Sequence, residues 1–500
     1  MSSPTAVSRV SRRALALGWM LAIATLAGCA VGPDYVRPPI TSPDRIRDAS
    51  PAGEPGAAGG TAQAASLADR GWWEIFPDAT LHALIDEALR NGYDLRLAAA
   101  RVEEARSEAG LARASYFPAV QGEAGWTRGR RVSGTAPDTS SLGLYDVNLG
   151  LTWEIDVWGR IRRLNEAALA DYMATEEARR GVLLSLVSDV ASSYFALREL
   201  DLQLDIARRT ARAFDETHDL FNRRLVAGAA SALETSSAAA SLAATNARIP
   251  DLERQIVAQE NRIALLLGRN PGTIARGLGL TDQPLPPDIP AGLPSDLLER
   301  RPDLREAEQR LIAANAEVGV AVADFFPTLS LTGAFGGLSP QVSELFGDGR
   351  TWSVGGGLLT PLFQGRRLKN QHQAALARWE EARVEYEQSV TSAFGEVSTA
   401  LVAYQKLADA EKEQSTAVDA YRQAVALSNS RYVGGLSDYL EVLQAQQQLF
   451  PAENVLAETR FQRLAALVEL YKALGGGWNL SDPQWTAPQT AGAPRVPTAG

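Results

Sequence analysis

The chain has 500 residues, of which 45% are hydrophobic and 22% are charged, as is typical of a folded protein with a large core. The formal net charge of -10 argues against nucleic-acid binding, because that function needs a basic face. A single cysteine excludes an internal disulfide bond.

Residues 1–28 have the pattern of a secretory signal. Arginines precede an apolar run at 14–27 that is too short for a membrane-spanning helix. The run ends in "LAGC", which resembles the lipobox of bacterial lipoproteins. We therefore expect cleavage before Cys29 and a covalent lipid on its sulfur, which would tether the mature chain to a membrane. The alternative is an ordinary signal peptide with an incidental cysteine.

No second apolar stretch of 18 residues follows this signal. We therefore expect no transmembrane helix in the mature chain, and any crossing of a membrane would need strands. Residues 29–70 are rich in proline, glycine and alanine, which predicts a lipid-anchored linker. The composition of residues 475–500 predicts a flexible tail.

The segment "DVNLGLTWEIDVW" at 146–158 alternates apolar and polar residues. Period-two alternation predicts a strand with one apolar and one polar face. Glu154 and Asp156 belong to the polar row. A similar alternation in "PTLSLTGAF" predicts another such strand at 326–336.

The chain contains the same unit twice. "DLRLAAARVEEARSEAGLARASYFP" at 94–118 matches "DLREAEQRLIAANAEVGVAVADFFP" at 303–327 in 12 of 25 positions. "RLVAGAASALE" at 224–234 matches "RYVGGLSDYLE" at 431–441, in the same order along the chain. Two matches in one order, together with "WGRIRR" over "QGRRLK" between them, indicate an internal repeat.

Each repeat has the pattern helix, strand, loop, strand, long helix, turn, shorter helix. The first repeat is predicted at 71–269 and the second at 297–474, with a proline-rich linker at 270–296 between them. The predicted strands are 117–128, 144–158, 326–336 and 351–363. The predicted long and return helices are 162–226, 231–267, 368–433 and 437–474.

The long helices carry a heptad repeat of apolar residues, which predicts packing along a partner helix as in a coiled coil. The helix at 162–226 would be roughly 98 Å long at 1.5 Å per residue, far more than a bilayer's hydrocarbon thickness. Short glycine-centred turns join each long helix to its return helix, with Gly228 in the first turn and Gly434 and Gly435 in the second.

Nothing in the sequence indicates a catalytic or metal site. His82, His218 and His372 are far apart, and the mature chain has no second cysteine to complete a ligand set. Neither a phosphate-binding glycine loop nor a metalloprotease helix motif is present. We therefore expect no enzyme, no metal and no cofactor beyond the lipid on Cys29.

Several stretches together resemble the TolC-like outer-membrane factor family, in its lipoprotein branch (NodT/OprM type). They include "GCAVGPDYVRP" (28–38), "WWEIFPDATLHALIDEAL" (72–89), "LTWEIDVWGR" (151–160), "GLPSDLLERRPDLREAE" (292–308) and "LVELYKALGGGW" (467–478). The resemblance covers nearly the whole mature chain. It implies a mixed α and β membrane protein in the outer membrane, a homotrimer whose chains each give four strands to a 12-stranded β-barrel. A long periplasmic α-helical coiled-coil barrel continues from it.

The resemblance also implies partners and sites. Such proteins are passive exit ducts for small molecules such as drugs, docked to a periplasmic membrane-fusion (adaptor) protein and an inner-membrane transporter, here expected to be RND-type. In the family the helix turns contact the adaptor, which points to Val226, Gly228, Val433, Gly434, Gly435 and Leu436. Family members place acidic residues near the second turn to narrow the pore, which makes Asp438 a candidate periplasmic gate. A plain helix cap is the alternative for Asp438.

The strand count supports the trimer independently of the resemblance. Four strands cannot close a barrel, and small membrane barrels begin at eight. An open sheet edge in lipid would leave backbone groups unpaired. Glu154 and Asp156, on the polar row, would then line the barrel lumen. Ducts for metal-ion efflux or type I protein secretion are close alternatives, and a structural envelope-spanning lipoprotein is an alternative of another class.

Overall fold

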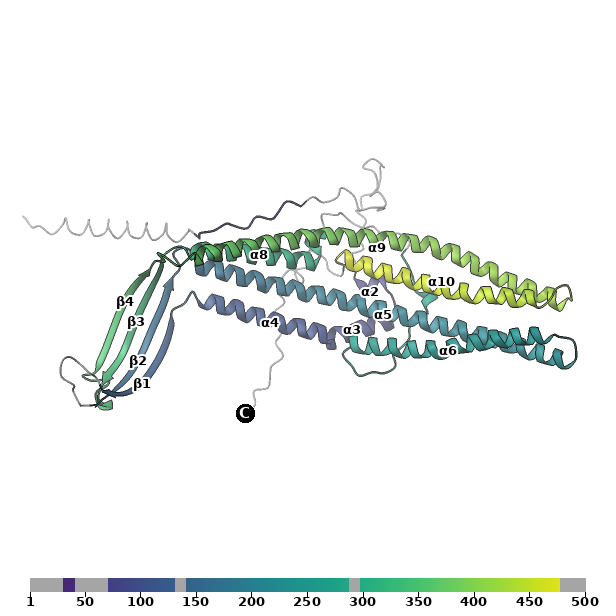
Figure 1. The fold of residues 1–500 in the computed structure, drawn as a ribbon, viewed down its shortest axis with the longest axis horizontal. Helices are drawn as coiled ribbons and strands as arrows, with labels where there is room; N and C mark the ends of the chain where they lie inside the picture. The colour runs from purple at the N-terminus through teal and green to yellow at the C-terminus, as the bar shows by residue number, and fades with distance from the viewer. Residues whose placement is uncertain (1–29, 41–70, 131–140, 287–296, 477–500) are drawn as a thin grey trace, which may run out of the picture. The chain divides into compact units, whose positions relative to one another are not determined.

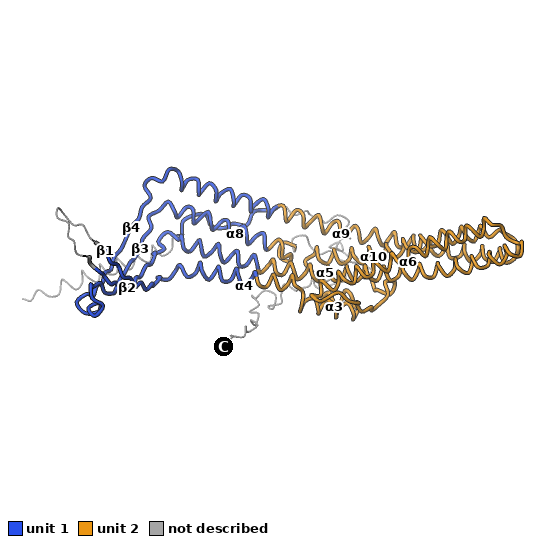
Figure 2. The backbone as a smooth tube through the Cα atoms, turned by 60° about the horizontal axis from the view of Figure 1, so that its bottom comes forward, with its two compact units in different colours: residues 1–39, 101–175, 306–387 blue, residues 40–100, 176–305, 388–500 orange. Residues whose placement is uncertain are grey.

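The structure is a computed structural model that describes residues 30–40, 71–130, 141–286 and 297–476. The signal peptide, Cys29, most of the linker at 29–70 and nearly all of the C-terminal tail lie outside the described residues. The chain divides into two compact units, coloured blue and orange in Figure 2. Unit 1 comprises residues 1–39, 101–175 and 306–387, and unit 2 comprises residues 40–100, 176–305 and 388–500.

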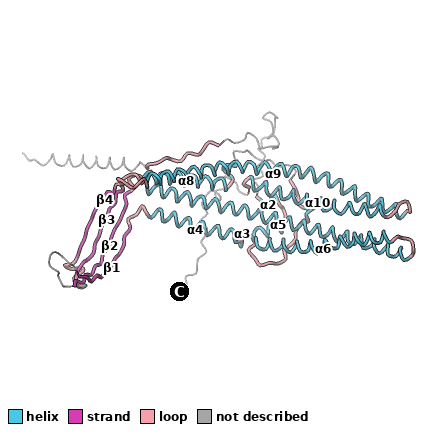
Figure 3. The backbone as a smooth tube through the Cα atoms, in the orientation of Figure 1, coloured by secondary structure: helices cyan, strands magenta, loops and turns pink. Residues whose placement is uncertain are grey.

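Helices dominate the described residues (Figure 3). The longest, α5 and α9, each begin in unit 1 and continue into unit 2. The helices are α2 (Trp72–Ile75), α3 (Ala79–Asn91), α4 (Tyr93–Ala114), α5 (Arg160–Val226), α6 (Ala232–Leu266), α7 (Leu297–Arg300), α8 (Pro302–Ala323), α9 (Arg367–Val433) and α10 (Leu440–Ala473). The described residues also form the 3-10 turns η2 (Leu280–Asp282) and η4 (Val342–Glu344).

The strands of unit 1 form one four-stranded sheet in the order β1-β2-β3-β4, with every neighbouring pair antiparallel (Figure 1). Three of the predicted strand limits were too wide, because each predicted strand included a proline. Proline has no backbone N–H to donate to a neighbouring strand. β1 begins after Pro118, β3 begins after Pro327, and β4 ends before Pro361. The strands are β1 (Ala119–Arg130), β2 (Ser141–Ile155), β3 (Thr328–Ser339) and β4 (Arg350–Leu359).

The long helices α5 and α9 contain 67 residues each. On α5 the heptad positions Val190, Leu197, Ala207 and Phe221 are buried, as a coiled-coil seam requires. Pro250 and Pro451 lie inside α6 and α10, and both helices continue through them. Among the described residues, no helix combines the length and apolar character needed to cross a membrane.

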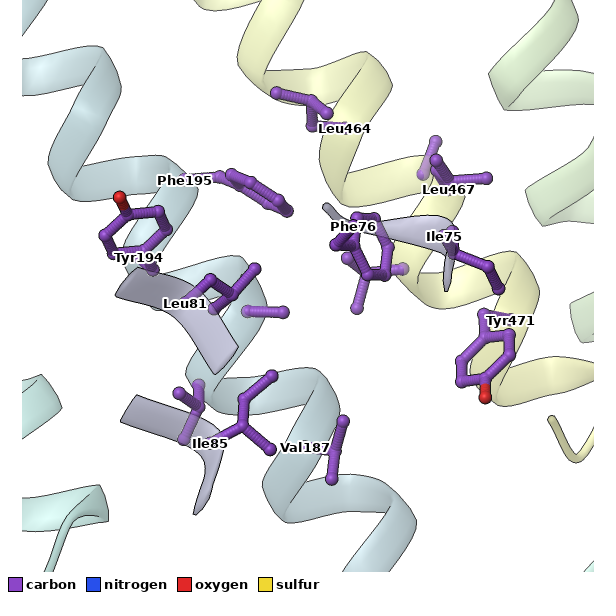
Figure 4. Close-up of a cluster of buried hydrophobic side chains, with 14 of the residues drawn as sticks. Ile75, Phe76, Leu81, Ile85, Val187, Tyr194, Phe195, Leu464, Leu467 and Tyr471 are labelled. Carbon is purple, nitrogen blue, oxygen red and sulfur yellow. The ribbon is translucent and has the colours of Figure 1, made fainter. Parts of the chain in front are cut away.

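The main core lies in unit 2, where α2 and α3 pack between α5 and α10 (Figure 4). Burying one large apolar side chain stabilises a fold by about 1.5–3 kcal/mol, so this cluster supplies much of the unit's stability. Its labelled members are Ile75, Phe76, Leu81, Ile85, Val187, Tyr194, Phe195, Leu464, Leu467 and Tyr471. Unit 1 has smaller helix contacts, such as the cluster of Val102, Ala105 and Tyr172.

Candidate functional surfaces: sheet faces, strand–helix junction and helix tips

The register gives the sheet one apolar and one polar face. Directly paired residues share a face, so the pairs Ala124↔Val147 and Val147↔Gly337 align the rows across three strands. The apolar face includes Val120, Trp126, Tyr145, Leu149, Leu151, Trp153, Leu329, Leu331, Phe335, Trp352, Val354 and Leu358. The polar face includes Gln121, Glu123, Thr127, Asp146, Asn148, Thr152, Glu154, Ser330, Thr332 and Ser353.

Much of the apolar face is exposed in the single chain. Trp126, Phe335 and Trp352 are 58%, 55% and 76% exposed. An exposed apolar surface of this kind marks contact with a membrane or a protein partner. Within the described residues, the outer edges of β1 and β4 pair with no other strand. The sheet therefore has two open edges and an apolar face that needs cover.

At the strand–helix junction, Glu154 remains on the polar face but is not a free carboxylate. It accepts two hydrogen bonds from Arg160, at 2.9 Å from Nε and 2.7 Å from Nη2. The strand placement of Asp156 was wrong, because β2 ends at Ile155. The Asp156 carboxylate instead accepts from the backbone N–H groups of Ile161 at 3.0 Å and Arg162 at 2.9 Å. It therefore caps the N-terminus of α5, where unpaired N–H groups attract a carboxylate.

The extended segment at 30–40 lies against the helices of unit 1. The N–H of Val31 donates to the carbonyl of Trp158 at 3.0 Å. Arg163, almost fully buried, forms a 2.7 Å ion pair with Asp34. A Cβ on Gly159 would lie 2.8 Å from Ala30. Ala30, which directly follows Cys29 in the sequence, is therefore held at the turn between β2 and α5.

Further along this segment, contacts to α8 continue. Glu308 accepts from the hydroxyl of Tyr35 at 3.1 Å and from the guanidinium of Arg37 at 2.6 Å. Gly32 has a φ of +98°, and a Cβ there would lie 2.5 Å from the Cα of Gly319. Only a glycine fits this approach without displacing backbone.

The first helix tip, residues 226–231, closes the hairpin of α5 and α6. Gly228 has a φ of +73°, and the N–H of Ala229 donates to the carbonyl of Arg224 at 2.7 Å. This is the αL glycine closure that commonly ends helices. Ser231 and Glu234 then form a capping box at the start of α6. Val226 is 91% exposed at the turn.

The second helix tip, residues 433–439, has the same backbone closure. Gly435 has a φ of +72°, and the N–H of Leu436 donates to the carbonyl of Arg431 at 2.9 Å. Gly434 lies outside the positive-φ region, so Gly435 alone meets the turn's conformational need. Val433 and Leu436 are 79% and 73% exposed.

Aromatic side chains connect α5 to the second tip. The rings of Phe221 and Tyr439 lie edge to face at 4.6 Å, and both side chains are buried. The hydroxyl of Tyr439 lies 2.6 Å from that of Thr217. Arg224 hydrogen-bonds to the hydroxyl of Tyr432, with its guanidinium carbon 5.0 Å from the ring centre. The two tips are therefore held by packing just behind exposed turns.

Asp438 is exposed at the second tip. One carboxylate oxygen accepts weakly from the N–H of Leu440, at 3.3 Å. Helix α10 begins at Leu440, so Asp438 precedes it rather than lying in its first turn. The geometry is that of a weak cap with a carboxylate open to solvent, which is compatible with either a cap or a gate role.

A buried polar node around Asp78 was missed by the sequence reasoning. Its carboxylate accepts from the Tyr194 hydroxyl at 2.9 Å, the Gln283 amide at 2.9 Å and the N–H of Leu278 at 3.0 Å. It also caps α3 through the N–H groups of Thr80 and Leu81. The "PDAT" motif signals the cap, but the other partners are far away in the sequence.

This hydrogen bonding controls the charge of Asp78. Burial raises the pKa of its carboxyl, but the hydrogen bonds from Gln283, Tyr194 and the backbone outweigh burial, so the pKa lies below its ordinary value. A Cβ on Gly277 would lie 2.2 Å from the carboxylate, so a side chain there would displace it.

A second buried node ties the start of α8 to two other helices. Arg301 donates to Asp303 at 2.7 Å, to Glu396 of α9 at 2.7 Å and to the carbonyl of Ala473 at 3.0 Å. These contacts fix the position of the start of α8. A basic side chain near the end of α10 also complements its carbonyl groups.

Each of the three histidines contacts another residue of the chain. The ring of His82 lies 2.6 Å from the carbonyl of Phe76, and Asn222 lies within 3.2 Å of His218. The ring of His372 lies edge-on to that of Phe325. In the part of the chain that the structure describes, no three His, Cys, Asp or Glu side chains gather as a metal site would require.

Comparisons with known proteins find similar sequences and structures over most of the chain. The sequence model of the Outer membrane efflux protein family matches residues 84–269 and 293–476. The toluene efflux pump outer membrane protein TtgC of Pseudomonas putida is 35% identical over 470 residues, which cover 91% of this chain and 93% of TtgC. The outer membrane lipoprotein SilC of Salmonella typhimurium, which is named as probable, is 32% identical over 464 residues, 92% of this chain and 98% of SilC. The open-state MtrE outer membrane channel of Neisseria gonorrhoeae superposes with a TM-score of 0.80, at 30% identity over 90% of this chain and 98% of MtrE.

Proposed function

Because the chain belongs to the outer membrane efflux protein family and is an outer-membrane efflux channel, we propose that three copies close one 12-stranded barrel. In this trimer each β4 pairs with the β1 of the next copy. The apolar face then contacts lipid and the polar face lines the pore. The long helices continue the duct into the periplasm.

One observation carries this proposal: the sheet has two faces of opposite character and two open edges. Each unpaired backbone group in lipid costs several kcal/mol, so an open four-stranded sheet cannot reside in a membrane alone. Closure by three copies satisfies both edges and covers none of the apolar face. Alternation of apolar and polar residues along each strand is the pattern of membrane barrels, and aromatic residues on the apolar face fit the membrane interfaces.

The helix tips are the contact points for a periplasmic adaptor. Both tips combine tight backbone turns with exposed apolar side chains, namely Val226 at the first and Val433 and Leu436 at the second. Small residues at a turn allow a partner helix to approach closely. The transporter that supplies the energy would be an inner-membrane pump of the RND type.

The lipid on Cys29 anchors the duct at a defined place. Ala30 lies against Gly159 in the turn between β2 and α5, and the ion pair of Asp34 with Arg163 holds the following segment. A lipid on the preceding residue would therefore enter the membrane surface from which the strands emerge. This arrangement lets the acyl chains and the sheet occupy one bilayer.

Small apolar or amphiphilic molecules are the proposed cargo, and conduction is passive. TtgC, a toluene efflux component by name, supports small organic compounds as the class. Metal ions are a rival cargo, although among the described residues no three His, Cys, Asp or Glu side chains gather as a metal site would require. A secreted polypeptide is the remaining rival, because the transporter would select the cargo.

Two experiments test the proposal. Purified oligomer reconstituted into planar bilayers should conduct ions, and complete absence of conductance would favour a structural envelope-spanning lipoprotein instead. Deletion of the gene should increase susceptibility to organic toxicants, with complementation by the full chain as the control. Unchanged susceptibility to all compounds would count against drug efflux but would not contradict the assignment of the protein as a channel.

A further inference from the structure

The loop between β3 and β4 has an ordered fold of its own. The N–H of Gly349 donates to the carbonyl of Glu344 at 2.9 Å, and the N–H of Leu338 donates to the carbonyl of Gly349 at 2.8 Å. The hydroxyl of Ser339 donates to Glu344 and accepts from the N–H of Gln341. These bonds make residues 340–349 a compact structure rather than an open turn.

This loop folds back over one particular face of the sheet. A Cβ on Gly337 would lie 1.9 Å from the carbonyl oxygen of Leu345, so Leu345 lies where a side chain of residue 337 would point. Gly337 pairs with Val147 and therefore belongs to the apolar face. Ser339, two residues on and thus on the same face, is also covered. The loop is seated on the apolar face and not over the polar one.

The seated loop buries one apolar side chain and exposes two. Leu345 is 4% exposed, whereas Val342 and Phe346 are 60% and 68% exposed. The loop lies at the end of the sheet away from the helices, because α8 leads into β3 and β4 leads into α9 at the other end (Figure 1). Trp352 and Phe335 lie on the same face, paired with each other below the loop.

We propose that the β3–β4 loop is a membrane contact that inserts Phe346 and Val342 among the lipids at the outer surface of the outer membrane. The inference rests on the proposed function, which assigns the apolar face to lipid. A loop continuous with that face is placed at the bilayer boundary, where aromatic side chains are favoured. The loop therefore lies on the lipid-facing side of the barrel and does not cover its pore.

Spin labels on single cysteines test the position of the loop. Nitroxides are attached at Phe346→Cys, Phe335→Cys and Leu338→Cys in the lipidated oligomer, reconstituted into phospholipid vesicles. Leu338 is a matched control, because it is exposed near the same end but pairs with Asp146 on the polar face. The parent protein should take up no label, since the sulfur of Cys29 carries the lipid.

Collision with oxygen reports lipid, and collision with a water-soluble nickel chelate reports water. We expect the ratio of oxygen to nickel accessibility at residue 346 to be severalfold higher than at residue 338, approaching that at residue 335. A ratio equal to that of residue 338 would overturn the inference. Low accessibility to both reagents would also overturn it, because it would indicate contact with another copy of the chain. If residue 335 itself is accessible to nickel, the barrel assignment fails instead.

A second variant tests the seat of the loop. Gly337→Ala places a methyl group where the carbonyl of Leu345 lies, so the loop must lift from the apolar face. Nickel accessibility of the label at residue 346 should then rise. An unchanged accessibility in the folded variant would refute the seating, and the measurement on the parent background stands if this variant fails to assemble.

Discussion

Asp78 and Asp438 both lie just before a helix, but the different burial of their side chains gives them different roles. Asp78 and Asp438 each accept a hydrogen bond from the backbone N–H two residues on, at 2.9 Å and 3.3 Å. Asp78 is 2% exposed and has further partners on α5 and in the segment before η2. Asp438 is exposed at a turn.

The two sites differ in whether the hydrogen-bond donors could bond to water if the carboxylate were removed. Around Asp78, buried donors have no water to replace their acceptor, so the carboxylate is structural. At Asp438, water replaces the cap, so the side chain is free to act on ions or on a partner. The predictions below test this contrast from the largest expected effect to the smallest.

Asp78→Ala should destabilise the protein by about 3 kcal/mol or more, because the hydroxyl of Tyr194 and the amide of Gln283 lose a buried acceptor. The measurement is denaturant unfolding followed by near-UV circular dichroism. Asp78→Asn, which keeps one acceptor oxygen, is the control and should lose less. An unfolding midpoint like that of the parent would show that the node is not structural.

Lowering the pH should reduce the stability of the parent protein, because Asp78 becomes protonated. Its folded-state pKa lies below the ordinary value, so the unfolded chain binds this proton first as pH falls. The stabilisation is present above about pH 4, the ordinary aspartate range, and is lost as pH falls below it. Thermal unfolding between pH 3 and pH 6 measures it. Asp78→Asn should show a shallower decline, and an identical decline would contradict the assignment.

Gly435→Ala should destabilise the second tip by about 1 kcal/mol, because alanine is strained at positive φ. Gly434→Ala is the matched control one residue away and should be near neutral, since Gly434 is not in that region. Hydrogen exchange of the amides near residues 431–436 reports the local opening. Equal effects of the two substitutions would mean that the turn does not depend on Gly435.

Asp438→Ala should change overall stability by no more than about 0.5 kcal/mol, since the cap is weak and exposed. If the carboxylates narrow the pore, single-channel conductance in planar bilayers should nevertheless rise. Ser437→Ala is the neighbouring control. A conductance equal to the parent's would remove the gate role and leave only the cap.

Strand alternation and helix-ending turns were predictable because they depend on neighbours in the sequence. Alternation along 146–155 specified a two-faced strand, and glycine after Val226 specified a turn at the first tip. The end of β2 was misplaced because Asp156 continues the alternation. Its carboxylate is instead used by the N-terminus of α5, a competing local interaction that alternation cannot reveal.

By itself, the sequence determined the element types, their order and the identity of the family, since periodicity, glycine turns and motif order are local properties. Tertiary structure alone decided which polar groups are buried and which loop covers which face. Asp78 meets Tyr194 and Gln283 across separations of 116 and 205 residues, and the seat of Leu345 depends on β-sheet register. Such contacts follow from packing of distant segments, where burial makes an unsatisfied hydrogen bond costly.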